Sequence, residues 1–235
     1  MTDEQRAQLL AKSKEFFIHE IIPSHYSGLE KASRLSNYNI NPFLTEYLAN
    51  FLCGDSSPES IAKALIYPRI LGTSITTIFG SQVQKMISSI FEGMGSTTNG
   101  IDIEYIDSVD GRRKYCQVKS GPNTINKDDV ETVKNHFNGV RRLARTNNID
   151  VGINDMVVGV LYGTPEELSA HYRVIAKDFP VLVGNEFWLR LTGDKDFYNE
   201  LIVSFGQAAQ AVDCRESLHS AIQTLADEIR RSTIF

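Results

Sequence analysis

The chain has 235 residues and a net charge of −5, and its composition is 42% hydrophobic and 23% charged. A chain of this size and composition buries a sizeable core, which excludes a disulfide-dependent miniprotein, a disordered chain and a fibrous repeat. No apolar run approaches the roughly 18 residues that cross a membrane, and the first residues carry no secretory leader pattern. We therefore expect a cytoplasmic protein. Its three widely spaced cysteines predict neither a disulfide framework nor a thiolate zinc site.

The first 92 residues predict helices. Apolar residues between Asp3 and Ile22 recur at helical spacing, and Pro23 is expected to end that helix before an irregular polar stretch. Two further helices, over 42–52 and 58–67, each begin with a polar residue followed by proline, at Asn41 and Ser57. A fourth helix is predicted over 78–91.

At Ile101 the apolar period changes from helical to alternating, which predicts a strand over 101–106. Asp110-Gly111 is a hairpin signal, and 112–119 would be the returning strand. A two-residue loop would pair Asp102 with Lys119, and a four-residue loop would keep the same side chains on one face. The hairpin therefore predicts one polar cluster, made of Asp102, Glu104, Gln117 and Lys119.

The remaining chain alternates helices with buried strands. An amphipathic helix is predicted over 127–146, with its apolar stripe at Val130, Val133, Phe137, Val140 and Leu143. A strand buried on both faces follows at 156–162, with short strands at 172–175 and 181–183. Helices are predicted over 186–191, 196–212 and 213–231. The expected fold class is α/β (mixed α+β), a central mixed sheet flanked by helices. We expect a helical region at 1–75 that serves in dimerisation or in embracing a bound polyanion, and a core with C-terminal helices at 76–235.

Positive charge gathers in one segment of this acidic chain. Between Arg112 and Arg145 there are nine basic residues and three acidic ones, so the rest of the chain carries a net charge of −11. Such asymmetry is typical of a surface that binds a polyanion. The alternative is a solvated helix face on which basic residues cluster by chance.

The hairpin cluster suits hydrolysis of a phosphodiester with a hard metal ion. A carboxylate such as Asp102 holds Mg²⁺ through oxygen, and a neighbouring lysine such as Lys119 stabilises the negative charge that develops at phosphorus. The alternative is a solvent-facing hairpin with a cross-strand ion pair, which contributes well under about 1 kcal/mol.

The strand, strand, helix, strand order with this cluster resembles the PD-(D/E)XK nuclease superfamily, with Ile101-Asp102 and Gln117-Val118-Lys119 as its motif. Gln117 stands where that family usually has Asp or Glu, although a Gln-x-Lys variant occurs in the superfamily. Three further segments resemble type II restriction endonucleases that cut sites with a GG-any base-CC core; they are 40–45, 157–163 and 185–188. This resemblance covers about residues 38–192.

The resemblance implies a Mg²⁺-dependent homodimer that cuts double-stranded DNA at a short (pseudo)palindromic site, alongside a cognate DNA methyltransferase. It implies that Asp102 binds metal and Lys119 is the catalytic lysine, with Gln117 and Glu104 as further catalytic residues and metal ligands. The preceding helix offers Gln82, Gln84 and Glu92 as additional polar groups. Candidate DNA contacts are Asn123, Thr124, Asn126, Lys127, Lys134, Arg141 and Arg142.

Two other interpretations remain open. The uncharged Gln117 is compatible with a catalytically inactive DNA-binding module. The same superfamily also includes repair and transposition nucleases, which would cut branched or nicked DNA rather than one sequence. Trp188, beside Phe187, is expected in the core rather than as a platform for base stacking.

Overall fold

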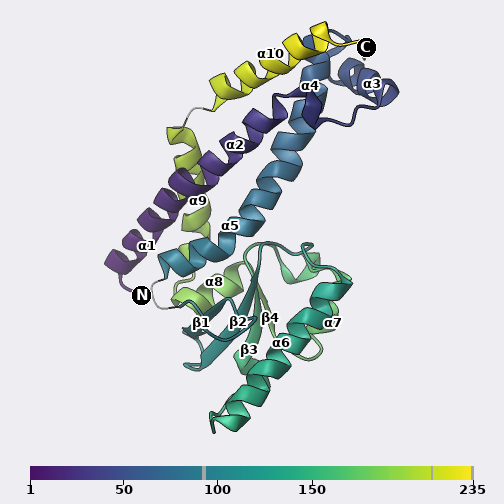
Figure 1. Cartoon of the computed structure of the whole chain (residues 1–235). Coiled ribbons are helices and arrows are strands. Elements are labelled where there is room, and N and C mark those ends of the chain that lie inside the picture. Colours follow the sequence, from purple (N-terminus) through teal and green to yellow (C-terminus); the bar gives the residue numbers. More distant parts are fainter. Residues whose placement is uncertain (92–93, 213, 234–235) are drawn as a thin grey trace. The chain divides into compact units, whose positions relative to one another are not determined.

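The computed structural model describes residues 1–91, 94–212 and 214–233, together forming two compact units (Figure 1). One unit, the sheet unit, comprises Met1–Lys14 and Val83–Gly206. The other, the helical unit, comprises Glu15–Gln82 and Gln207–Phe235. The predicted domain boundary between residues 75 and 76 stays a prediction. In the described ranges, no helix is both long and apolar enough to cross a membrane.

The sheet unit is built on a four-stranded mixed sheet, which confirms the expected fold class. Its strands lie in the order β1 (Ile103–Ile106), β2 (Arg113–Lys119), β3 (Met156–Val160) and β4 (Val181–Val183). The β1–β2 pair is antiparallel, whereas β2–β3 and β3–β4 are parallel. All five residues of β3 are buried, as expected for a strand covered on both faces.

The hairpin register differs by two residues from the pairing expected for a two-residue loop. Ile103 pairs with Cys116 and Ile106 with Arg113, so Glu104 lies opposite Tyr115. The loop is therefore the four-residue alternative, residues 108–111, and not the two-residue one. Because side chains alternate with a period of two, a shift of two residues leaves the face of each side chain unchanged. Asp102, Glu104, Gln117 and Lys119 remain on one face, and Ile103, Tyr105, Cys116 and Val118 are buried on the other.

Helix α6 (Lys127–Thr146) connects β2 to β3 and covers one face of the sheet (Figure 1). Asn126 caps it, because its side chain accepts hydrogen bonds from the main-chain N–H groups of Asp128 and Asp129. The predicted apolar stripe is buried except at Leu143, whose exposed fraction is 52%. Ala144 takes that place, since it follows Phe137 by seven residues and Val140 by four on the same helix face.

The C-terminal part of the sheet unit contains one wrong prediction. Residues 172–175 lie in a helix, α7 (Ala170–Ile175), and not in a strand. Its neighbours β4 and α8 (Asn185–Thr192) agree with the sequence. Trp188 is 2% exposed and donates its indole N–H to the carbonyl of Leu161 at 2.8 Å, which confirms it as a core residue.

The N-terminal helices differ from the prediction at Pro23. Helix α1 (Asp3–Phe16) passes through a π-helical turn, Phe17–Ile21, directly into α2 (Ile22–Ala32). Pro23 lies in the first turn of α2, where a missing N–H costs no intrahelical hydrogen bond. The predicted end at Pro23 is therefore wrong, and the irregular stretch begins only after Ala32.

The helices predicted from polar-proline starts are confirmed. Helix α3 (Pro42–Cys53) is capped by Asn41 and ends at Gly54, whose φ of 82° is the left-handed conformation glycine adopts readily. Helix α4 (Pro58–Pro68) is capped by Ser57 and continues through the π-helical turn Arg69–Ser74 into α5 (Ile75–Ile90). The last helices are α9 (Phe197–Ala211) and α10 (Arg215–Arg231). In the helical unit, α10 packs against α2 and α4 around a core that includes Leu29, Ile61, Ile66 and Leu225.

Candidate active site

Asp102 lies just before β1 and is held against β2 by two hydrogen bonds. Its main-chain N–H donates to the carbonyl of Cys116 at 3.0 Å, and its Oδ2 accepts the N–H of Val118 at 2.7 Å. Burial raises the pKa of Asp102, an effect that the Val118 hydrogen bond and the charges of Lys119 and His136 only partly offset. The result is a desolvated carboxylate that an additional cation would stabilise.

Gln117 points from β2 into the same site and is only 5% exposed. Its amide nitrogen donates to the carbonyl oxygen of Gly100 and lies 2.6 Å from Nδ1 of His136. Since a carbonyl oxygen only accepts, the nitrogen of the amide must face Gly100. Both amide hydrogens are then used, and Oε1 of Gln117 is the atom left to bind a cation.

His136 is a further residue of the site, which the motif spacing in the sequence did not single out. It comes from α6 and packs so closely on Gly100 that a Cβ there would overlap the imidazole ring. Gly100 also has a φ of 77°, so both its conformation and its neighbour require glycine. Helical spacing in the sequence could have indicated that His136 faces the sheet. It follows Val133 by three residues and precedes Val140 by four, and both valines are on the buried side of the helix.

Lys119 occupies the last position of β2, where β3 fixes the strand. It pairs with Val160, and its carbonyl accepts the N–H of Leu161 at 3.1 Å. Its ammonium lowers the pKa of Asp102, so the two charges share one electrostatic environment. Among the residues that the structure describes, no carboxylate forms an ion pair with Lys119. A half-buried lysine beside a desolvated carboxylate can therefore act on an incoming anion.

Glu104 lies on the same face but is already bound within the chain. Its Oε1 accepts the hydroxyls of Ser96 at 2.7 Å and Thr98 at 3.1 Å. Its Oε2 forms an ion pair with Arg113 at 3.2 Å. The carboxylate thus fixes the segment that leads to Asp102, and it would have to exchange the Arg113 contact to bind a metal.

Residues 37–213, more than half of the chain, match the family described as Type II restriction endonuclease EcoO109I. The chain belongs to this family. The match confirms the resemblance to type II restriction endonucleases and extends it beyond residue 192. Members are DNA-cutting hydrolases of restriction-modification systems, and the enzyme class expected from the sequence is confirmed. No curated protein matches the sequence.

Type II restriction endonucleases typically depend on a metal ion, and the donor set here fits Mg²⁺. Asp102 offers a carboxylate and Gln117 an amide oxygen, both hard oxygen ligands of the kind that Mg²⁺ takes together with water and phosphate oxygens. Over the described ranges, no three acidic, histidine or cysteine side chains gather into a metal-binding group. The side chain of Gln84 and all of Glu92 lie outside the described residues, and Gln82 belongs to the helical unit.

The predicted DNA contacts in this restriction endonuclease fall into two groups along α6. At its N-terminal end, Asn123 and Lys127 are exposed, whereas Asn126 caps the helix. Thr124 donates its hydroxyl to the carbonyl of Gly121. Further along, Lys134 forms an ion pair with Asp178 at 2.6 Å. A shallow basic depression near the C-terminal end is lined by Asn135, Asn138, Arg141, Arg142 and Arg145.

Proposed function

We propose that this protein is a Mg²⁺-dependent type II restriction endonuclease that hydrolyses double-stranded DNA at a short (pseudo)palindromic site with a GGNCC-like core. The observation that supports it most is the meeting of Asp102 and Lys119 at one end of β2, where burial raises the pKa of the carboxylate. Membership of the family supplies the DNA substrate. The base preference rests on the resemblance of three short segments alone.

Asp102 and the amide oxygen of Gln117 would hold the metal ion. When bound, Mg²⁺ supplies Lewis acidity toward the phosphate and lowers the pKa of an attacking water. Lys119 stabilises the negative charge that develops on the phosphate oxygens and positions the water by hydrogen bonding. Glu104 stays a predicted ligand and a second source of negative charge.

We assign the DNA contacts to the solvent-facing side of α6 and to the loop before it. Lys127 and Arg141 lie about 21 Å apart along a helix that rises about 1.5 Å per residue, so they would meet phosphates several base pairs apart. Asn123, Arg142 and Lys134 would add polar contacts, Lys134 by giving up Asp178. Thr124 and Asn126 would act by shaping the loop.

The residues that the structure describes form one such site, whereas a double-strand cut needs two. We therefore propose a homodimer on a near-palindromic duplex, in which each protomer cuts one strand. A cognate methyltransferase would protect the host's own copies of the site.

Digestion of a sequenced long duplex tests the proposal. With Mg²⁺, the full-length protein should produce discrete fragments whose ends share one motif. Asp102→Asn and Lys119→Ala should each lower the cleavage rate by roughly 10²-fold or more while gel-shift affinity changes little. Lys195→Ala, which removes an exposed lysine of the same unit, is the matched control and should cut normally.

Three outcomes would contradict the proposal. Intact DNA from a broad sequence library, without binding, would exclude a nuclease. A gel shift without cleavage, unrescued by Gln117→Glu, would favour the inactive DNA-binding module. Cleavage of branched or nicked DNA without a sequence motif would favour a repair or transposition nuclease.

A further inference from the structure

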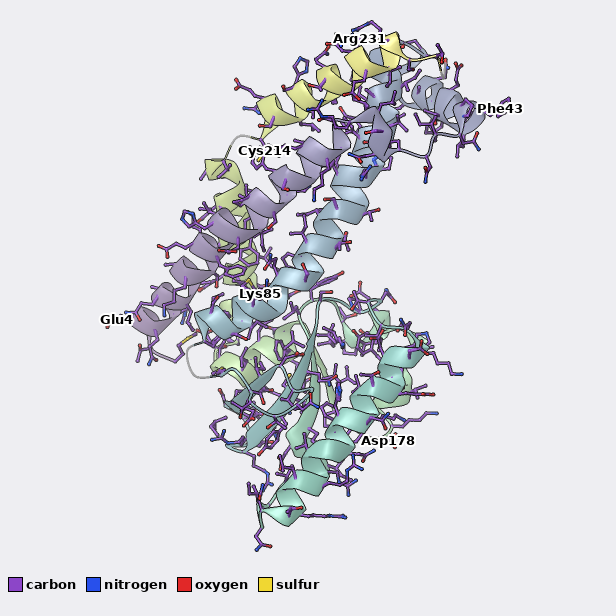
Figure 2. All side chains as sticks on the ribbon, viewed as in Figure 1. Glu4, Phe43, Lys85, Asp178, Cys214 and Arg231 are labelled. Atoms are coloured by element: carbon purple, nitrogen blue, oxygen red, sulfur yellow. The ribbon has the colours of Figure 1, made fainter. Side chains whose placement is uncertain are left out.

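Helix α3 presents its large side chains to solvent and its small ones to the core. Thr45 and Ala49 are the buried residues of α3, which packs against α4 in the helical unit. Phe43, Tyr47 and Phe51 have exposed fractions of 89%, 61% and 79%. Figure 2 shows Phe43 pointing outward from the end of this helix. A surface helix normally has the opposite arrangement, with the large apolar side chains inside.

The exposed residues form two adjacent ridges with a spacing of four residues. Phe43, Tyr47 and Phe51 make the first ridge, in which the rings of Tyr47 and Phe51 stack with their centroids 6.1 Å apart. Leu44, Leu48 and Leu52 make the second, each at least 37% exposed. We call these six residues the α3 face. Two helices with such ridges interdigitate readily, each ridge entering the groove of the other.

The charge on α3 narrows the choice of partner. Glu46 is the only charged residue of the helix, and α3 carries no lysine or arginine. DNA would require basic side chains for its phosphates. An interfacial membrane helix would likewise carry Lys or Arg on its polar side. The α3 face therefore fits the apolar surface of another protein.

The area of the α3 face matches half of a standard protein interface. Given about 150–250 Å² per aromatic side chain, the exposed fractions leave roughly 340–570 Å² on the three aromatic residues, and the three half-exposed leucines add to this area. A stable complex buries about 800 Å² on each partner, and a typical monomer's largest apolar patch is about 300–600 Å². None of the six side chains is charged, so two copies of the face can meet about a twofold axis without opposing like charges.

We propose that the α3 face is where two copies of this chain associate, α3 packing against α3 of the partner subunit about a twofold axis near Tyr47. This contact would be the interface of the homodimer proposed above. It rests on the proposed function only for what the dimer does, which is to cut two strands.

Complementary charges at residue 47 provide the test. In sedimentation velocity at micromolar concentration, the full-length wild type should be a dimer, and Tyr47→Glu and Tyr47→Lys should each be monomers. An equal mixture of the two variants should recover the dimer, which also shows that both are folded. Ile202→Glu, at an apolar position on α9 that is 54% exposed against 61% for Tyr47, is the matched control and should stay dimeric.

Each other result overturns the assignment. A dimer that survives Tyr47→Glu places the interface elsewhere and leaves the proposed nuclease intact. A monomeric wild type whose α3 amides exchange slowly would mean that the chain covers this face itself. Failure of the mixture to recover the dimer would contradict pairing about Tyr47. Because sedimentation needs neither DNA nor metal, its result is independent of whether the protein cuts.

Discussion

At the scale of single residues, Asp102 sits in an environment that opposes its own charge. Burial raises its pKa above the ordinary 3.8, while the Val118 N–H, Lys119 and His136 favour the ionised form less strongly than burial disfavours it. An ionised Asp102 therefore costs folding free energy at neutral pH in the absence of a cation. Active-site residues commonly have this property, because the arrangement that serves chemistry is not the one that maximises stability.

Replacing Asp102 by Asn should therefore stabilise the metal-free protein. We expect the free energy of unfolding at pH 7 to rise by about 1 kcal/mol, since the amide oxygen still accepts the Val118 N–H without a buried charge. A group with a raised folded-state pKa is unfavourable only once it ionises, so the difference should vanish as the pH falls below 3.8. Urea unfolding at several pH values measures it.

Mg²⁺ should make the wild type more stable relative to Asp102→Asn. Millimolar Mg²⁺ should raise the midpoint of thermal unfolding of the wild type but not of Asp102→Asn, because a ligand that binds only the folded state stabilises it. Glu131→Gln, at an exposed position on α6, is the control and should behave as the wild type. A metal-free Asp102→Asn that is less stable than the wild type at pH 7 would contradict this account.

Gln117→Glu should have opposite effects on metal affinity and on stability. The new carboxylate oxygen would face the carbonyl of Gly100 without a hydrogen between them, which should lower the free energy of unfolding by about 1–2 kcal/mol. It would also add a negative charge at the metal position, so the Mg²⁺ concentration for half-maximal binding should fall. Calorimetric Mg²⁺ titration and urea unfolding separate the two. Equal stability would show that the Gly100 contact does not hold the amide.

At the scale of elements, an ion-pair network fastens the β1–β2 hairpin to the start of β3. The carboxylate of Asp155 forms ion pairs with Arg112 at 2.5 Å and with Lys114 at 3.2 Å, and the Lys114 side chain is 2% exposed. Hydrogen bonds from Arg112 hold the pKa of Asp155 at about 2. This network sets the position of β2 in the sheet and hence of the residues that β2 carries, Gln117 and Lys119.

Asp155→Asn should lower the free energy of unfolding by about 3 kcal/mol at pH 7, because it leaves the charge of Lys114 buried with less compensation. The stability that a carboxyl group with a lowered pKa provides is present above its ordinary pKa of 3.8 and is lost as the pH falls toward 2. The wild type and the variant should therefore converge near pH 2. Asp150→Asn, whose side chain is 89% exposed, should cost less than about 1 kcal/mol. Equal losses in the two variants would contradict a buried network.

At the scale of the whole molecule, the fold places some of the basic side chains of residues 112–145 in ion pairs within the chain and leaves the others available to DNA. Four of its nine basic side chains form ion pairs within the chain, Arg112, Arg113, Lys114 and Lys134. The other five, Lys119, Lys127, Arg141, Arg142 and Arg145, have no ion pair to any described residue. The excess of positive charge in the sequence therefore overstates what DNA can meet without rearrangement, and the available part lies at Lys119 and along α6.

DNA binding should weaken steeply with salt, and the slope should report these available charges. The double variant Arg141→Ala/Arg142→Ala should reduce the slope of log K against log salt by up to about 2 if both side chains contact phosphates. Lys134→Ala should have a smaller effect, because Lys134 already pairs with Asp178. Fluorescence anisotropy with a labelled duplex measures it. An unchanged slope in the double variant would place the DNA elsewhere.

Local patterns in the sequence determined much of this protein. Capping residues and proline placed α3 and α4, and alternation placed β1, β2 and β3. Because the parity of a hairpin survives a shift of two, two-residue and four-residue loops alike place Asp102 and Lys119 on one face, so this prediction did not depend on the loop length. Pro23 was misjudged because a π-helical turn before it lets the chain continue as a helix, which residue spacing does not reveal.

Only the tertiary structure decided how the candidate site is held. Gln117 meets Gly100 and His136 from separate segments, and Asp155 joins two charges more than 40 residues away in the chain. Such contacts follow from packing α6 and the hairpin on the sheet, and no local periodicity encodes them. Tertiary packing also decides which basic residues form ion pairs and which stay available. On α3 it buries Thr45 and Ala49 and leaves the six large side chains exposed.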